Sequence, residues 1–226
     1  MIRKYANLWL LALVLTAVLV LASSCAGSST GEQGSAEQGT NEESTSAMQG
    51  MEHTDMEIGS GQMTDASQLV MENGKYSDER FIDAMVPHHQ GAIDMAEVAL
   101  QNAEHPEIRT LATNIISAQE AEIKQLKAIK QRQYGTAEVP TQLSSEEMQM
   151  MGMTMSPQEL ANEQPFDKAF IDAMIPHHHS AIEMAQVAQE NSTDPEIQDL
   201  AQGIITGQQA EIQQMTDWRK EWYPEG

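Results

Sequence analysis

The chain has 226 residues, of which 34 are acidic and 12 basic, and its formal net charge is −22. This charge argues against a nucleic-acid-binding protein, which needs a basic surface. It suits a protein that attracts cations, although acidity also serves solubility alone. Aromatic residues make up only 4% of the chain, which is low for a β-sandwich or barrel, whereas methionine is frequent at 16 residues.

The first 24 residues have the pattern of a lipoprotein signal peptide. Arg3 and Lys4 precede an apolar run from Leu8 to Ala22, which is shorter than the ~20 apolar residues of a bilayer span. Small residues then lead to Cys25, the only cysteine, so an intrachain disulfide is impossible. We expect Cys25 to carry the lipid anchor, with an uncleaved N-terminal anchor as the alternative. Both place the protein outside the cytoplasm, facing the periplasm or the cell exterior.

Residues 25–74 are expected to form a flexible tether. This stretch, above all residues 26–60, is rich in Gly, Ser, Thr, Glu and Gln, with almost no large apolar residue other than methionine. Such a segment cannot bury enough apolar surface to fold. About 150 residues remain, which is enough for one compact domain.

The remainder contains an internal repeat. Residues 78–123 align without a gap to residues 167–212 at an offset of 89, and about 27 of the 46 aligned positions are identical. The segment from Phe81 to His89 recurs from Phe170 to His178. The sequence therefore predicts a duplication of one structural unit.

Each copy is predicted to be a helical hairpin, over residues 75–135 and 165–226. Ser77 is a good N-cap for the first helix, and Pro106 and Pro195 stand at the first position of the second helix in each copy. The apolar residues follow helical spacing. We predict an all-α four-helix bundle made of two tandem hairpins, joined by a polar, mostly irregular, methionine-rich linker over residues 136–164.

Pro87 and Pro176 fall inside the first helix of each hairpin. A proline at these positions frees the backbone carbonyl four residues earlier, at Asp83 or Asp172, and bends the helix. The bend is predicted to lie directly before a pair of histidines in both copies. Either a structural or a functional reason can account for it.

Each hairpin is predicted to place polar residues inside its apolar core. Gln119 and Glu122 fall in the apolar stripe of the second helix, where polar side chains are costly unless they are paired. On the first helix, His88 and His89 share the core face with methionines on both sides. The candidate metal ligands are Met85, His88, His89 and Met95 in the first hairpin and Met174, His177, His178 and Met184 in the second.

In an antiparallel helical hairpin, residues at equal distances from the turn lie opposite each other on the two helices. On this basis His88 is predicted to lie opposite Glu122, and His89 opposite Gln119. The second hairpin repeats the pattern, so that the further predicted pairs are His177 with Glu211 and His178 with Gln208.

Two interpretations of these polar residues are open. In the first, the histidines and glutamates form a buried hydrogen-bond network that fixes the register of the bundle. In the second, imidazoles and thioethers bind a metal, supported by Gln119, Glu122, Gln208 and Glu211 as hydrogen-bond partners or as ligands.

Methionines in polar segments favour the second interpretation. Core filling does not explain thioethers in segments that are expected to be unfolded. Thioethers select Cu(I), and imidazole suits Cu(II) as well, so copper is the expected ion and silver its chemical mimic. Docking of a linker helix on a partner protein is the alternative. The residues expected to assist copper capture are Met148, Met150, Met151, Met153 and Met155 in the linker and Met48, Met51, His53 and Met56 in the tether.

The motif Met-x-Pro-His-His-x-x-Ala-Ile-x-Met-Ala at residues 85–96 and 174–185 resembles the bacterial domain-of-unknown-function 305 family. The resemblance covers about residues 75–223 and implies a ferritin-like fold. Some members of that family are periplasmic copper-binding proteins linked to copper resistance. The resemblance therefore implies that the motif histidines and methionines bind copper. A di-iron site is not expected, because no glutamate stands three residues before any histidine.

We therefore expect a lipid-anchored protein that sequesters or transfers copper at the cell envelope. Its expected partners are copper ions and, through the anchor alone, the membrane, with no nucleic acid and no organic cofactor. The sequence contains no nucleophile–base arrangement, so we expect no catalysis, and a copper-dependent oxidoreductase is the enzymatic alternative. The competing function is a structural or adaptor bundle whose His–Glu layers only set the packing register.

Overall fold

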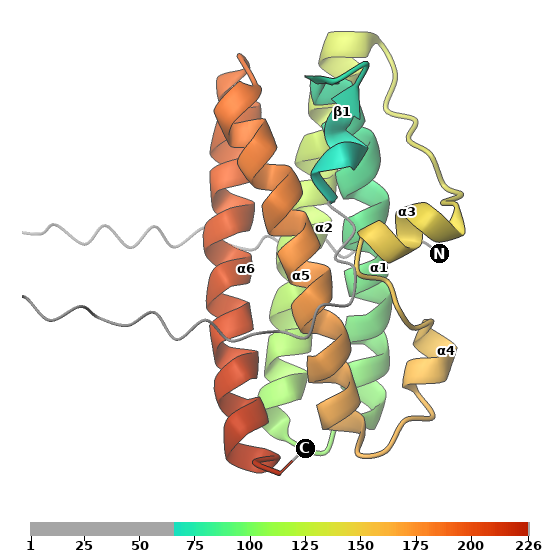
Figure 1. Ribbon diagram of the computed structural model, residues 1–226, viewed down its shortest axis with the longest axis vertical. Coiled ribbons are helices and arrows are strands. Elements are labelled where there is room, and N and C mark those ends of the chain that lie inside the picture. The colour runs from blue at the N-terminus through green and yellow to red at the C-terminus, as the bar shows by residue number, and fades with distance from the viewer. Residues whose placement is uncertain (1–65, 226) are drawn as a thin grey trace, which may run out of the picture. The chain divides into compact units, whose positions relative to one another are not determined.

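The computed structural model describes residues 66–225, and four long helices account for most of them (Figure 1). Helix α1 packs along α2 and α5 along α6, and the two hairpins meet mainly through α1 and α5. The predicted all-α four-helix bundle of two tandem hairpins is confirmed. None of the described helices is long and apolar enough to cross a membrane. The helices are α1 (Asp78–Asn102), α2 (Pro106–Tyr134), α5 (Phe166–Asn191) and α6 (Pro195–Trp222).

The helix ends follow from local sequence. The Ser77 side chain accepts a hydrogen bond from the backbone N–H of Arg80 at 3.3 Å, which caps α1. Pro106 and Pro195 begin α2 and α6, where a missing N–H costs no helical hydrogen bond. Gly135 ends α2 with a φ of 75°, a conformation that glycine adopts without steric cost.

The internal prolines lie within continuous helices, Pro87 in α1 and Pro176 in α5. Each proline removes the hydrogen bond to the carbonyl four residues earlier, which belongs to an aspartate in both copies. The side chain of each aspartate forms an ion pair with the second helix of its own hairpin, at equivalent repeat positions. These ion pairs join Asp83 to Lys130 and Asp172 to Arg219.

The turns of the two hairpins lie at opposite ends of the bundle, and each is bound by the other hairpin (Figure 1). Asp167, at the start of α5, accepts hydrogen bonds from the backbone N–H groups of Glu104 and His105 at 3.0 and 2.8 Å. At the opposite end, Arg132 of α2 forms an ion pair with Glu196 of α6 at 2.8 Å. These contacts align the hairpins along their length.

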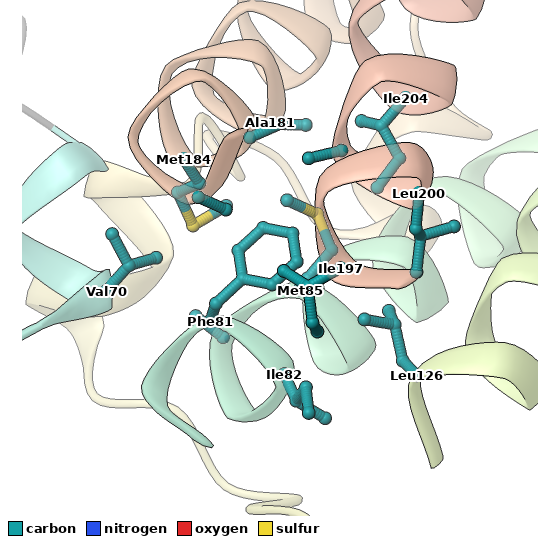
Figure 2. Packing of buried hydrophobic residues seen from close by; sticks show 14 of the residues in the cluster. Val70, Phe81, Ile82, Met85, Leu126, Ala181, Met184, Ile197, Leu200 and Ile204 are labelled. Carbon is teal, nitrogen blue, oxygen red and sulfur yellow. The ribbon is translucent and has the colours of Figure 1, made fainter. Parts of the chain in front are cut away.

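The core consists of two apolar clusters. The first takes Phe81 and Met85 from α1 together with Met184 from α5 (Figure 2). The second takes Phe170 and Met174 from α5 together with Met95 from α1. Each cluster therefore combines the start of the motif helix of one hairpin with the end of the motif helix of the other. This exchange follows from the antiparallel crossing of α1 and α5.

The segment before α1 corrects the predicted tether, which extended to residue 74. Residues 66–70 form a short 3₁₀ helix (η1, Ala66–Val70), and β1 (Met71–Glu72) pairs antiparallel with β2 (Lys75–Tyr76). Leu69 and Val70 are buried in the first cluster. Burial of these two side chains, together with a hydrogen bond from the Ala66 N–H to Glu183 at 3.1 Å, attaches this segment to the bundle. The predicted signal peptide (1–24) and residues 25–65 lie outside the described part of the chain.

The linker between the hairpins contains two short helices, α3 (Ser145–Met150) and α4 (Pro157–Leu160). Both begin with a capping box, formed by Ser144 with Glu147 and by Ser156 with Glu159. The side chain of Leu160 is fully buried in the second cluster. Most of the linker is irregular, as expected, but the expectation did not include these two helices. The capping boxes stabilise both of them, and burial of Leu160 stabilises α4 as well.

Candidate metal centre

The four motif histidines lie together at the centre of the bundle. Their side chains are completely buried. Each apolar cluster takes residues that precede the histidines on one motif helix and follow them on the other, so the histidines separate the clusters. The rings of His88 and His177 touch, with centroids 3.8 Å apart. We call His88, His89, His177 and His178 the histidine layer.

Two members of the layer pair with carboxylates of their own hairpin. The Nε2 atom of His89 lies 2.9 Å from a carboxylate oxygen of Glu122, and that of His178 lies 2.7 Å from Glu211. The predicted pairs of His88 with Glu122 and of His177 with Glu211 are therefore wrong by one residue. Successive side chains on a helix point about 100° apart. His89 consequently faces α2, while His88 faces α5.

Gln119 and Gln208 are buried, as expected from their position in the apolar stripe. Neither pairs with the predicted histidine, because His89 and His178 bind the glutamates instead. The Oε1 atom of Gln119 and both polar side-chain atoms of Gln208 have no hydrogen-bond partner. Their amides therefore add uncompensated polar groups to the interior beside the histidine layer.

The hydrogen bonds of His88 define its protonation state. Its Nε2 atom lies 3.1 Å from the backbone oxygen of His177 and 2.8 Å from the Oγ of Ser180. A carbonyl oxygen can only accept, so Nε2 carries the proton and the lone pair is on Nδ1. Burial, followed by the proximity of His177 and His89, lowers the pKa of His88 well below its ordinary value. The ring is therefore neutral at physiological pH.

His177, like His89, forms no side-chain hydrogen bond, but only His89 has a carboxylate beside its ring. Neither the Nδ1 nor the Nε2 of His177 has a hydrogen-bond partner. Burial, followed by the charges of His178 and His89, lowers the pKa of His177 well below its ordinary value. A buried polar atom without a partner costs about 1–3 kcal/mol. This neutral imidazole is thus available to bind a ligand or a metal.

The motif methionines are buried beside the histidines. Met85 precedes His88 and His89 by three and four residues, which places the three side chains on one helix face. Met174 has the same relation to the histidines of α5. Met85 and Met184 pack in the first apolar cluster, where Figure 2 shows them. Met95 and Met174 pack in the second.

The linker methionines are more buried than expected for a polar, mostly irregular segment. Met151 is only 1% exposed and belongs to the first cluster. Met150 and Met153 pack against the same cluster, and Met155 packs against the second. Met148 alone among the linker methionines is exposed, at 38%. The other predicted capture and lipidation residues lie outside the described residues: Met48, Met51, His53, Met56 and Cys25.

The described residues contain no group of three or more His, Cys, Asp or Glu side chains arranged to hold a metal ion. The donors that the histidine layer offers are unpaired imidazole nitrogens, and the other donors nearby are thioethers. Such a donor set suits a soft ion of low coordination number better than a hard cation, which prefers oxygen ligands.

The family model described as Domain of unknown function (DUF305) matches residues 24–130 and 78–219, which together span most of the chain. The chain belongs to the DUF305 family. A curated relative, the uncharacterized protein L153 of Acanthamoeba polyphaga mimivirus, is 45% identical over 52 residues. That match covers 23% of this chain and spans about a third of the relative, 34% of its length.

Solved structures share the fold. CopM in its Cu(II)-bound form is 44% identical, with a TM-score of 0.61, and the match covers 66% of this chain and 99% of CopM. CopM has also been solved in Cu(I)-bound, silver-bound and apo forms. A DUF305 fragment from Deinococcus radiodurans is 28% identical with a TM-score of 0.56, over 62% of this chain and 93% of the fragment.

Sequence reasoning missed two residues of this DUF305 site, Gly91 and Ser180. They occupy equivalent positions in the two copies, and Ser180 contacts His88. The signal was present in the alignment, because the two motifs differ between glycine and serine at this position and between Gln90 and His179 at the one before it. A difference inside a duplicated motif marks a place where the two copies have different surroundings.

Proposed function

We propose that this DUF305 protein binds copper and sequesters or transfers it at the cell envelope. The proposal is supported by its 44% identity to CopM, whose solved forms include Cu(I), Cu(II) and silver complexes. The match covers nearly the whole of CopM, so the likeness includes the entire bundle rather than one motif.

The observation that carries the proposal is the histidine layer. The pKa values of His88 and His177 are lowered by burial, so both rings are neutral, which is the form that binds metals. The Nδ1 of His88 and both nitrogens of His177 have no hydrogen-bond partner. A bound metal ion would compensate these nitrogens, whereas a purely structural layer would leave them uncompensated.

The nature of the neighbouring side chains favours copper over zinc or iron. Met85 and Met174 follow the same helix faces as the histidines, and thioethers are ligands for Cu(I). Glu211 hydrogen-bonds to the Nε2 of His178 and would orient that ring as carboxylates orient metal-bound imidazoles, and Glu122 lies 2.9 Å from the Nε2 of His89. The chain would thus combine soft ligands with oriented imidazoles.

The envelope location rests on the N-terminal sequence. A positive start, a short apolar run and small residues before Cys25 are typical of a lipid-anchored exported protein. The strong acidity of the chain would raise the local concentration of cations near the membrane surface. We propose a non-catalytic role, since the sequence contains no nucleophile–base arrangement.

A structural or adaptor bundle is the second candidate. The specific observation in its favour is that His89 and His178 already pair with Glu122 and Glu211, which would fix the register of each hairpin without a metal. This candidate explains the outer pairs of the layer. It gives no role to the unpartnered nitrogens of His177.

Titration of the complete chain, purified in mild detergent, with Cu(I) and Cu(II) against competing chelators separates the candidates. Copper binding predicts dissociation constants well below about 1 µM for at least one ion, and weakened binding in the His88→Gln/His177→Gln double variant. Circular dichroism of the variant controls for its fold. Binding of both ions weaker than about 1 µM by the native chain would favour the adaptor.

A further inference from the structure

The two copies of the repeat differ at one position that contacts the histidine layer. In α5, the Oγ of Ser180 lies 2.8 Å from the Nε2 of His88 and donates to the backbone oxygen of Met151 at 2.9 Å. The equivalent residue in α1 is Gly91, which has no side chain. The Nε2 of His177 therefore lacks the hydroxyl partner that the Nε2 of His88 possesses.

A methionine occupies the corresponding space. A Cβ atom placed on Gly91 would lie 3.4 Å from the Nε2 of His177 and 3.4 Å from the Sδ of Met153. The two atoms therefore lie at most about 6.8 Å apart. The thioether and the unpartnered nitrogen thus converge on the same small space above Gly91, which a side chain at this position would fill.

The backbone of the linker fixes Met153 at this place. Gly152 adopts a φ of 68° and packs so closely on α5 that an added Cβ would lie 2.8 Å from backbone atoms of Pro176 and His177. The N–H of Met153 donates to the carbonyl of Met148 at 2.9 Å. Met151, on the other side of Gly152, is buried in the core. The backbone of Met153 is thus held by the residues that precede it.

An ion can approach this place from solvent. A groove of about 320 Å³ is lined by Gly91 and Met153, with Asp94 among its polar residues. Its charged lining residues are Asp94 and Lys127, so the walls of the groove carry one carboxylate and one ammonium group. His177 lies behind the groove and is completely buried.

We infer that the Met153 thioether and the His177 Nε2 atom form a Cu(I) site above Gly91, at which Ag(I) also binds. The inference rests on the proposed copper function and assigns it a particular entry-side site. Metal–nitrogen and metal–sulfur bonds of about 2.0 and 2.3 Å require the donors to lie within roughly 4.3 Å. Rotation about the Cα–Cβ and Cβ–Cγ bonds of the unbranched methionine side chain moves the sulfur and can bring it within that distance. Neither nitrogen of His177 has a hydrogen bond of good geometry, and the backbone of His88 is the one polar group near enough to raise the pKa of the ring, so the tautomer with its lone pair on Nε2 gives up at most that weak contact.

Three variants of the complete chain test this site. Met153→Leu removes the sulfur and keeps most of the volume. Gly91→Ser supplies His177 with a hydroxyl like that of Ser180 and displaces only the flexible end of Met153. Met148→Leu is the matched control, because Met148 lies in the same segment and is exposed.

The measurements are competitive titration with Cu(I) and Ag(I), and the NMR shift of the ¹³C-labelled methionine methyl groups on addition of Ag(I). The first two variants are expected to lose one equivalent of ion or to bind it at least about tenfold more weakly, with the control unchanged. The Met153 methyl signal of the native chain is expected to move with that equivalent.

The outcomes separate this site from the general function. A native chain that binds copper, with Met153→Leu and Gly91→Ser binding identically, would show that Met153 merely fills space, and only this site would be abandoned. A native chain that binds neither Cu(I) nor Ag(I) would overturn the copper function and this site together.

Discussion

The imidazole rings of His88 and His177 meet at the centre of the bundle, with centroids 3.8 Å apart and planes inclined by 42°. The two residues are repeat equivalents, 89 positions apart. A residue that touches its own equivalent lies at the axis that relates the two copies. The duplication therefore places two imidazoles of identical origin against each other. Burial lowers the pKa of both rings, and the proximity of His177 lowers the pKa of His88 further.

The stability of the metal-free protein is expected to fall as the pH falls below about 6.5. The unfolded chain titrates its histidines near the ordinary value of 6.5, whereas folding lowers the pKa of His88 and His177. Between the lowered pKa and pH 6.5 the unfolded state binds more protons than the folded state. The contribution of the two rings to stability is therefore complete above pH 6.5 and decreases as the pH falls toward their lowered pKa. Each ring adds a slope of up to about 1.4 kcal/mol per pH unit.

Urea unfolding at pH 7.5 and 5.5 measures this effect. The His88→Gln/His177→Gln double variant is the control, and its stability should change less between the two pH values. Equal pH dependence in both proteins would contradict the assignment of the effect to these two rings.

Asp83→Asn is expected to destabilise the fold more than the equivalent change Asp172→Asn. Lys130, the partner of Asp83, has a side chain only 5% exposed, whereas the Arg219 partner of Asp172 is 19% exposed. Without the Asp83 carboxylate, the buried ammonium group of Lys130 keeps only Glu79 as a charged partner, at 3.7 Å. The free energy of unfolding should therefore fall by about 1–3 kcal/mol. Loss of the more solvated pair, Asp172 with Arg219, should lower the free energy of unfolding by less than about 1 kcal/mol. Chemical denaturation of both variants provides the comparison, and equal losses would refute it.

Asp167→Asn is expected to lower the free energy of unfolding by about 2–3 kcal/mol. Asp167 is 1% exposed and also contacts the Nδ1 of His105 at 2.6 Å. His105 is the N-cap residue of α2, but its side chain makes no capping hydrogen bond. Asp167 of α5 instead accepts hydrogen bonds from the backbone N–H groups of Glu104 and His105 at this helix end. Asp217→Asn is the control at an exposed position of α6, where a change within about 0.5 kcal/mol is expected. Thermal unfolding checks both, and a neutral Asp167→Asn would remove this role.

Alanine at two glycines should have effects of opposite sign. Gly152→Ala is expected to destabilise the fold by about 1–3 kcal/mol, because the residue has a positive φ and its Cβ would collide with the backbone of α5. Gly203→Ala, within α6 and facing open space, should stabilise it by roughly 0.5–1 kcal/mol. Differential scanning calorimetry measures both shifts. An increase in melting temperature for Gly152→Ala would show that the linker is not packed on α5 as described.

Much of the fold could be predicted because its signals are local. Ser77, Pro106 and Pro195 set helix starts through their own side chains, and the burial of Gln119 followed from its place in an apolar stripe. The 3₁₀ helix at Ala66–Val70 could not be predicted in this way. Its few apolar residues do not mark it as folded within a polar segment, and they are buried only by packing against α1 and α5.

The sequence by itself determined the duplication, the two hairpins and the inward direction of the histidines, because helical periodicity fixes which side chains share a face. Only the tertiary structure decided which neighbour each side chain meets. His88 faces His177 and His89 faces Glu122, since adjacent residues on one helix point toward different helices. The position of Met153 over Gly91 likewise depends on how the linker packs across α5, a long-range contact that no local pattern encodes.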